Sequence, residues 1–331
     1  MQRSANDKPR LEALDFARGA ALLAMAVYHF TWDLEFFGHA PPGMTAEGGW
    51  RLFARGIATS FLFLVGVSLW LAHGRGIRIR PFLKRLAMVG AAAAAISLAT
   101  WLAVPNGFIF FGILHQIALA SVLGLAFLRL PAPVTVAVAV AVAVAPSFLR
   151  SAFFDHPALW WVGLSSVNPR SNDYVPLFPW FAAVLAGIAG ARMAQAAGLL
   201  DRLGRLSLAC WTRPLQWAGR HSLAFYLVHQ PVLIGGLWLY AQAVPAAEAP
   251  RDIQFTRACV AQCETTHDAA FCGHYCVCML EEIVAEGRFD EIYEGRQSDE
   301  TSRRLQEIVS ACTFEAERFS TETEGAGREG Q

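Results

Sequence analysis

The stretch that decides the fold is Asp15-Phe-Ala-Arg-Gly-Ala-Ala-Leu-Leu-Ala-Met-Ala-Val-Tyr-His-Phe-Thr-Trp-Asp33. It lies in an apolar segment, residues 11–37, which is long enough to cross a bilayer, since a crossing takes about 20 apolar residues. Inside this segment lie Asp15, Arg18, His29 and Asp33. At about 100° per residue, all four project from one narrow face of a helix. Such groups normally face a protein interior or a wet cavity, so this face predicts a functional site. The alternative is two local pairs, Asp15 with Arg18 and His29 with Asp33, that serve only helix packing.

The composition places the whole chain in a membrane. Of its 331 residues, 55% are hydrophobic and 16% are charged, and the mean hydropathy is +0.36. Soluble domains carry about 25% charged residues. The formal net charge is zero, and no basic tract is present, so we expect no nucleic-acid partner. The first apolar segment is too long for a cleavable signal peptide and has no small-residue cleavage site.

The predicted fold class is all-α: a polytopic membrane helix bundle of about seven spans with a small Cys-rich helical C-terminal tail. The expected domains are a transmembrane domain, residues 1–245, and a tail, residues 246–331, that ends in a polar disordered segment. Hydropathy predicts these spans: 11–37, 51–73, 82–103, 108–128, 132–149, 178–197 and 220–243. The fifth alternates Val and Ala, which is a strand pattern, but an isolated strand cannot satisfy its backbone in lipid. We therefore expect a helix there, at the lipid-facing periphery.

Loop charges predict the orientation in the membrane. The second connection and the sixth connection are rich in basic residues: Arg75, Arg78, Arg80, Lys84 and Arg85, then Arg202, Arg205, Arg213 and Arg220. Positive loops stay in the cytoplasm, so the N-terminus is expected there. With seven spans, the tail is then extracytoplasmic, and the protein is a multi-pass protein of the inner (plasma) membrane.

Other spans also carry polar residues that we expect to point inward. His115 and Gln116 lie in the fourth span, and Ser222, Tyr226 and His229 share one helical face of the last span. Each histidine has an alternative interpretation, as a core residue hydrogen-bonded to a neighbouring helix. Polar groups on several spans favour a shared cavity.

The tail contains six of the seven cysteines. Two Cys-x3-Cys pairs place their thiols on one face of each of two helices, so a hairpin would join Cys259 to Cys276 and Cys263 to Cys272. Cys278 and Cys312 remain and would form a third bridge. A zinc site is the alternative, but an extracytoplasmic location favours disulfides, and no metal is expected.

Four segments together resemble a known family. They are Arg18-Gly-x9-His29-x3-Asp33, Phe61-Leu-Phe-Leu-Val-Gly66-Val-Ser68, Phe111-Gly112-Ile-Leu-His115-Gln116 and Gly219-Arg-His-Ser222-Leu-x2-Tyr226-x2-His229. Over residues 10 to 240 the chain resembles the heparan-α-glucosaminide N-acetyltransferase catalytic-domain family, whose members are transmembrane acyltransferases related to membrane acyltransferase-3 enzymes. The resemblance implies acyl transfer from cytoplasmic acetyl-CoA, or another acyl-CoA, to a glycan amine or hydroxyl on the far side. It also implies an active-site role for His29, and it suggests His39 as a match to a loop histidine of the lysosomal member.

These residues suggest a mechanism. His29 has a suitable intrinsic pKa for a general base, and Asp33, one turn away, would orient its ring. Arg18, with Asp15, would contact the phosphates or pantetheine amides of the donor. The basic 75–85 loop would also bind the phosphates; the alternative is that its positive residues only reflect the excess of Lys and Arg found in all cytoplasmic loops. The pocket for the carbohydrate acceptor would be lined by His39, His115, Gln116, Ser222, Tyr226 and His229.

Several alternatives stay open at this level. A proton-coupled transporter could use the same cavity of His, Asp and Arg, although no inverted repeat or pair of broken helices supports it. In a further alternative, the membrane domain only anchors a tail that has a redox or assembly role. The polar faces of the first and last spans disfavour this alternative. Direct transfer and an acyl-His intermediate are both compatible with the sequence, as are N- and O-acylation and a homo-oligomer.

Overall fold

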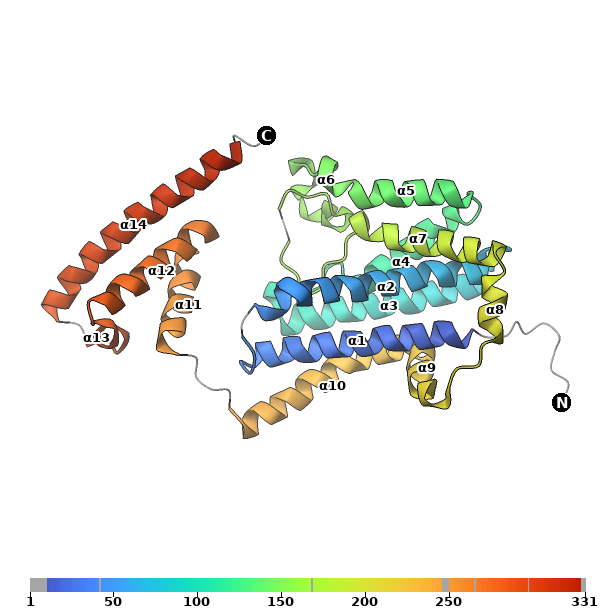
Figure 1. Cartoon of the computed structure of the whole chain (residues 1–331), viewed down its shortest axis with the longest axis horizontal. Helices are drawn as coiled ribbons and strands as arrows, with labels where there is room; N and C mark the ends of the chain where they lie inside the picture. The colour runs from blue at the N-terminus through green and yellow to red at the C-terminus, as the bar shows by residue number, and fades with distance from the viewer. Residues whose placement is uncertain are drawn as a thin grey trace. The chain divides into compact units, whose positions relative to one another are not determined.

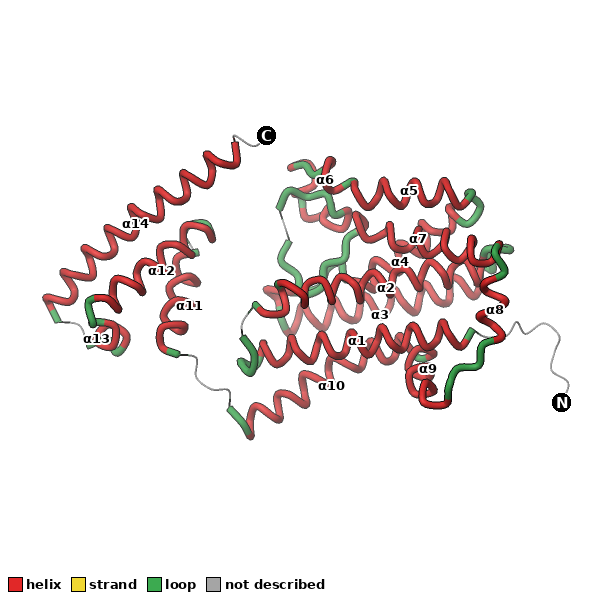
Figure 2. Tube along the Cα trace, in the orientation of Figure 1, coloured by secondary structure: helices red, strands yellow, loops and turns green. Residues whose placement is uncertain are grey.

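The computed structural model describes residues 11–41, 43–167, 169–245, 250–264, 266–296 and 298–328, and its side chains up to residue 319. The chain divides into two compact units, Met1–Ala246 and Ala247–Gln331. Helices dominate the described residues of both units, and no strand occurs among them (Figures 1 and 2).

The first unit is a bundle of long helices joined by short loops and 3-10 turns. Its membrane-unit helices are α1 (Glu12–Phe36), α2 (Gly48–His73), α3 (Ile79–Ala103), α4 (Ile113–Phe127), α5 (Ala132–Val144), α6 (Pro146–Leu149), α7 (Leu177–Ala196), α8 (Leu199–Arg205), α9 (Arg213–Arg220) and α10 (Ser222–Ala243). Each of the seven predicted segments contains a long helix, and the Val-Ala segment is helical, as its lipid setting requires.

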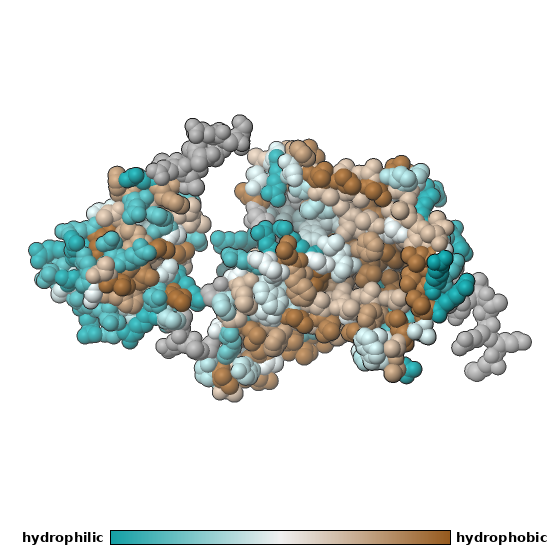
Figure 3. Space-filling view, viewed as in Figure 1, coloured by the Kyte–Doolittle hydropathy of each residue, from teal (hydrophilic) through white to brown (hydrophobic). Residues whose placement is uncertain are grey.

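Four of these helices, α2, α3, α7 and α10, are long and apolar enough to cross a membrane. Helix α1 is as long, with 25 residues, but it differs from these four helices because it contains several ionisable residues. Helices α4 and α5 are shorter apolar helices of 15 and 13 residues. Hydrophobic side chains cover most of the visible face of this unit (Figure 3). The unit is therefore a membrane bundle, and the count of seven spans remains a prediction.

Two glycines let α2 and α7 approach each other closely. A Cβ at Gly66 would lie 2.0 Å from the Val184 carbonyl oxygen, and a Cβ at Gly187 would lie 2.1 Å from the Phe63 carbonyl oxygen. Both obstacles are backbone atoms, which cannot swing aside. Small residues at such crossings allow the close van der Waals contact that holds helices together in lipid, where apolar burial contributes little. The core of the unit surrounds this crossing and includes the fully buried Leu62.

We expect Gly66→Ala to destabilise the unit, because the added methyl group forces the two helices apart. Overpacking of this kind costs about 1–3 kcal/mol. Thermal unfolding of the detergent-solubilised protein measures the effect. Gly90→Ala in α3 is the matched control, since a Cβ there meets nothing within 4 Å. An equal fall in midpoint for both variants would contradict the close crossing.

Helix α1 packs against two later segments of the chain, α9 and α10 (Figure 1). Its contact with α9 again depends on glycine. A Cβ at Gly19 would lie 1.9 Å from the Leu215 carbonyl oxygen, and a Cβ at Gly219 would lie 1.9 Å from the Asp15 carbonyl oxygen. Residues about 200 positions apart in sequence are thereby brought against the polar face of α1.

The second unit is helical and contains α11 (Arg251–Cys263), α12 (Ala269–Ala285), α13 (Phe289–Tyr293) and α14 (Asp299–Arg328). Its disulfides are Cys259–Cys276, Cys263–Cys272 and Cys278–Cys312, the same pairs that the cysteine spacing predicts. The first two join α11 to α12, and the third joins α12 to α14. The small core between these helices includes the fully buried Ile283. The visible face of this unit is mostly hydrophilic (Figure 3).

Candidate active site

The first cluster of polar residues lies near the start of α1. The Arg18 guanidinium donates to an Asp15 carboxylate oxygen at 3.0 Å and to the Ser68 hydroxyl oxygen of α2 at 2.7 Å. Asp15 and Ser68 are buried, whereas Arg18 is half-buried. Arg18 is thus fixed by one residue of its own helix and one of α2. The sequence indicated Ser68 only as the last residue of one of the four family-like segments, and not as a partner of Arg18.

The second cluster is a pair of histidines where α1 meets α10. The His29 and His229 rings have centroids 5.0 Å apart and are inclined by 60°. The His229 ring also lies parallel to the Phe225 ring, at 6.4 Å. Its Nδ1 is 2.7 Å from the Tyr226 carbonyl oxygen, a contact within the same helix. The structure therefore brings together two histidines that the sequence placed on separate spans.

Asp33 is fully buried, and its partner is a residue that the sequence did not identify. The Gln230 side-chain amide donates to Asp33 Oδ1 at 2.7 Å. Asp33 Oδ2 and Gln230 Oε1 are buried and have no hydrogen-bond partner among the described residues. No hydrogen bond joins Asp33 to the His29 ring in the described part of the chain. Gln230 adjoins His229 in sequence, which is the only signal that could have indicated it.

The proposed loop histidine lies just beyond the end of α1. The His39 ring is 5.2 Å from the Tyr240 ring of α10, and its buried Nε2 has no partner within the described ranges. Three contacts between α1 and α10 thus follow one another along the two helices, at His29, Asp33 and His39. We call this row the α1–α10 seam.

His115 lies in a different setting. Its Nδ1 accepts the Gly112 backbone N–H at 3.2 Å, and its Nε2 is 3.2 Å from the Ser97 hydroxyl of α3. The Ser97 hydroxyl donates to the Ile109 carbonyl oxygen at 2.6 Å. Both ring nitrogens therefore have structural partners, and the ring joins the start of α4 to α3. This geometry agrees with the alternative interpretation of His115 as a core residue.

Gln116 is fully buried, and neither of its side-chain polar atoms has a partner among the residues described. Tyr226 is half-buried and packs against the hydrophobic groups of several helices. Ser222 begins α10 and is separated from His229 by about 10 Å along the helix. The structure gives Ser222 no contact with the histidine pair.

Asp173, in the loop before α7, carries another carboxylate, and the sequence did not single out this residue. It accepts the Ile113 backbone N–H at 2.8 Å and so caps α4, where a negative charge is favourable. Burial raises the pKa of Asp173 to about 6, although the Ile113 N–H acts in the opposite direction. The carboxylate also interacts electrostatically with the Tyr226 hydroxyl. This loop therefore reaches toward the α10 face that carries His229.

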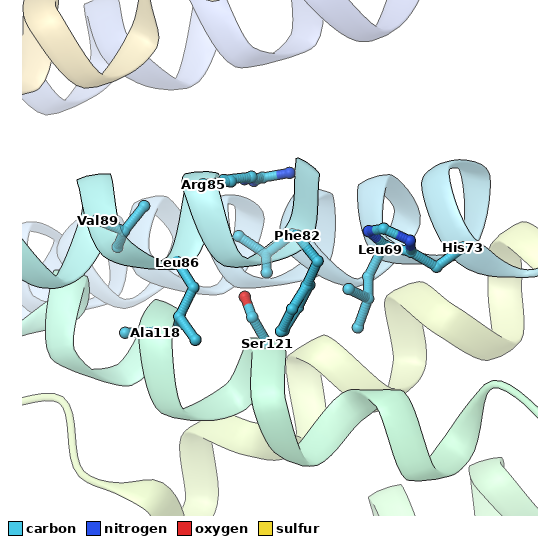
Figure 4. A pocket seen from close by; sticks show the side chains of 9 residues that line it. Leu69, His73, Phe82, Arg85, Leu86, Val89, Ala118 and Ser121 are labelled. Carbon is cyan, nitrogen blue, oxygen red and sulfur yellow. The ribbon is translucent and has the colours of Figure 1, made fainter. Parts of the chain in front are cut away.

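A separate pocket lies between α2, α3 and α4 (Figure 4). His73, Arg85 and Ser121 are its polar lining residues, and Phe82 and Leu69 are among the apolar ones. The sequence has no Asp or Glu between residues 48 and 154, so the basic residues there have no acidic neighbour in the chain segment. Within the described residues, no group of three or more His, Cys, Asp or Glu side chains could hold a metal ion.

The comparison with protein families gives one match. The model of the heparan-alpha-glucosaminide N-acetyltransferase catalytic domain matches residues 10–231, which is two thirds of the chain. The chain belongs to this family. The matched range contains both polar clusters of α1 together with His229 and Gln230, and it excludes the tail.

Family membership confirms the resemblance that the four sequence segments indicated, and it implies that the protein is a membrane acetyltransferase. The family in general uses acetyl-CoA and acts on carbohydrates. No curated protein and no solved structure matches the chain.

Proposed function

We propose that this protein transfers an acetyl group from cytoplasmic acetyl-CoA to an amine or hydroxyl of a glycan on the opposite side of the membrane. The observation that carries the proposal is the α1–α10 seam, where His29 and His229 lie side by side above a buried Asp33. Burying polar groups in a membrane bundle costs free energy, so their presence indicates a function. Membership of an acetyltransferase family indicates that this function is acetyl transfer.

The acceptor nitrogen or oxygen attacks the acetyl carbonyl carbon, and the carbon–sulfur bond of the thioester breaks. His29 takes the proton that the acceptor loses, and the departing thiolate of coenzyme A takes that proton back. Direct transfer of this kind needs one base in contact with the acceptor. In this proposal that base is His29 of the seam, and the donor and the acceptor approach it from opposite faces of the membrane.

Arg18 supports the donor side of this scheme. It lies about 16 Å from His29 along α1, toward the end predicted to be cytoplasmic. Its guanidinium is already positioned by Asp15 and Ser68, so it can donate to a phosphate or a pantetheine amide without losing much side-chain entropy. The basic residues near the α2–α3 turn, Arg85 among them, complement the phosphates of the nucleotide (Figure 4).

The test uses purified protein, acetyl-CoA with a labelled acetyl group, and glucosamine, which offers both an amine and hydroxyls. We expect release of coenzyme A and acetylated sugar, and slow release of coenzyme A without sugar, because water can replace the acceptor. Mass spectrometry of the product separates N-acetylation from O-acetylation. Absence of coenzyme A release with every sugar tested, combined with proton-coupled uptake in vesicles, would replace the enzyme by a transporter.

We expect Arg18→Ala to raise the Michaelis constant for acetyl-CoA by roughly tenfold with a smaller change in turnover, because its contact with the donor is the same in the ground and transition states. Steady-state kinetics with varied acetyl-CoA measure the split. Arg129→Ala, at an exposed position between α4 and α5, is the matched control for loss of one positive charge. A fall in turnover at unchanged Michaelis constant would contradict the donor role.

A further inference from the structure

The backbone of α10 fixes the tautomer of His229. Its Nδ1 lies 2.7 Å from the Tyr226 carbonyl oxygen. A carbonyl oxygen can only accept a hydrogen bond, so Nδ1 carries the proton. In the neutral ring, Nε2 then carries a lone pair and no proton.

This lone pair is buried and has no hydrogen-bond donor. The His229 residue is 9% exposed, and its Nε2 has no partner among the described residues. A buried acceptor without a donor destabilises the folded state, because it has lost its hydrogen bonds to water. The adjacent ring is that of His29, inclined by 60° at 5.0 Å, a ring that could bring an N–H to this lone pair.

The partner of Asp33 points to the same conclusion. The sequence placed Asp33 one turn from His29 and gave it the task of orienting the ring. In the structure, the Asp33 carboxylate is held by Gln230 instead. The ring that lies against the His29 ring and offers a lone pair is that of His229. Asp33 Oδ2 has no partner among the described residues, so the test must compare both groups.

We propose that His229 is the positioning residue of His29. When His29 takes the proton of the acceptor, the His29 imidazolium donates an N–H to Nε2 of His229, which orients the ring and stabilises its charge. The proton stays on His29 until the coenzyme A thiolate takes it, and His229 remains neutral throughout. Catalytic hydrogen bonds of this kind commonly shorten only when substrates are bound. This inference rests on the proposed acetyl transfer.

Two substitutions at His229 separate the lone pair from the packing of the ring. His229→Phe keeps a flat ring against Phe225 but has no lone pair to offer. His229→Gln loses the ring but provides a side-chain carbonyl oxygen as an acceptor. We expect the Phe variant to lose roughly 100-fold in turnover, with Michaelis constants for acetyl-CoA and glucosamine within about twofold of wild type. We expect the Gln variant to turn over about tenfold faster than the Phe variant, since an uncharged oxygen acceptor replaces the imidazole only in part.

The same assay is run on Asp33→Asn, which keeps the shape of the side chain that Gln230 holds. We expect its turnover to fall less than that of His229→Phe. A Phe variant within threefold of wild-type turnover would overturn the proposal, as would a Gln variant no better than the Phe variant. A larger turnover loss in Asp33→Asn than in His229→Phe would return the orienting role to Asp33. Wild-type protein that transfers no acetyl group at all would overturn the proposed function itself, which distinguishes the two failures.

Discussion

We expect His29→Ala to abolish acetyl transfer, with a turnover lower by at least about 100-fold, while the protein remains folded and in the membrane. Loss of a general base costs about 10²–10⁴ in rate. His29 is half-buried and has no hydrogen bond within the described residues that its loss would break, so the fold should tolerate alanine. Release of coenzyme A in the presence of glucosamine measures the effect.

The control for this prediction is a neighbour on the same helix. Phe30→Ala removes a larger side chain that is 43% exposed and lies about 100° around the helix from His29, and it should leave turnover nearly unchanged. Size-exclusion profiles and thermal midpoints of both variants show whether they fold. Near-normal turnover in folded His29→Ala would remove His29 as the base, whatever the fold.

The second large effect concerns the tail. Without reduction, one thiol of seven should react with a maleimide in denatured protein, because the three bridges occupy six cysteines and Cys210 is free. After reduction, all seven should react. Mass spectrometry of the labelled protein counts the thiols. The loop charges predict that the tail is extracytoplasmic, a setting in which disulfides persist.

Removing a bridge should destabilise the tail strongly. The loss of a native disulfide from a small domain costs about 2–5 kcal/mol, mainly because the unfolded chain regains freedom. The double variant Cys259→Ser/Cys276→Ser should therefore become sensitive to protease in the tail, whereas Cys210→Ser should not. Seven reactive thiols in protein that was never reduced would mean either that a span was miscounted, so that the tail lies in a reducing compartment, or that the cysteines hold a metal.

The sequence by itself determined the helices and two of the three cysteine pairs, since these follow from local spacing, whereas the pair Cys278–Cys312 followed only from the two cysteines left over. The periodicity of residues 11–37 places His29 and Asp33 on one face of α1, and this follows from the geometry of a single helix. Two Cys-x3-Cys pairs allow one simple antiparallel pairing, and the structure contains it. The Val-Ala segment shows that a local pattern can mislead. Its residues alternate as in a strand, but the segment forms a helix, because only a helix satisfies its backbone hydrogen bonds in lipid.

Only the tertiary structure decided which groups face one another. Gln230 bonds to Asp33 across 197 residues, and His229 meets His29 across 200, and no spacing rule connects positions so far apart. A sequence shows which face of a helix is polar, but not which other helix will cover it. That choice depends on how closely helices can approach, which here is set by glycines such as Gly19 and Gly219 at the contact of α1 with α9. The packing of α9 and α10 against α1 therefore brings separate polar residues together into a candidate active site.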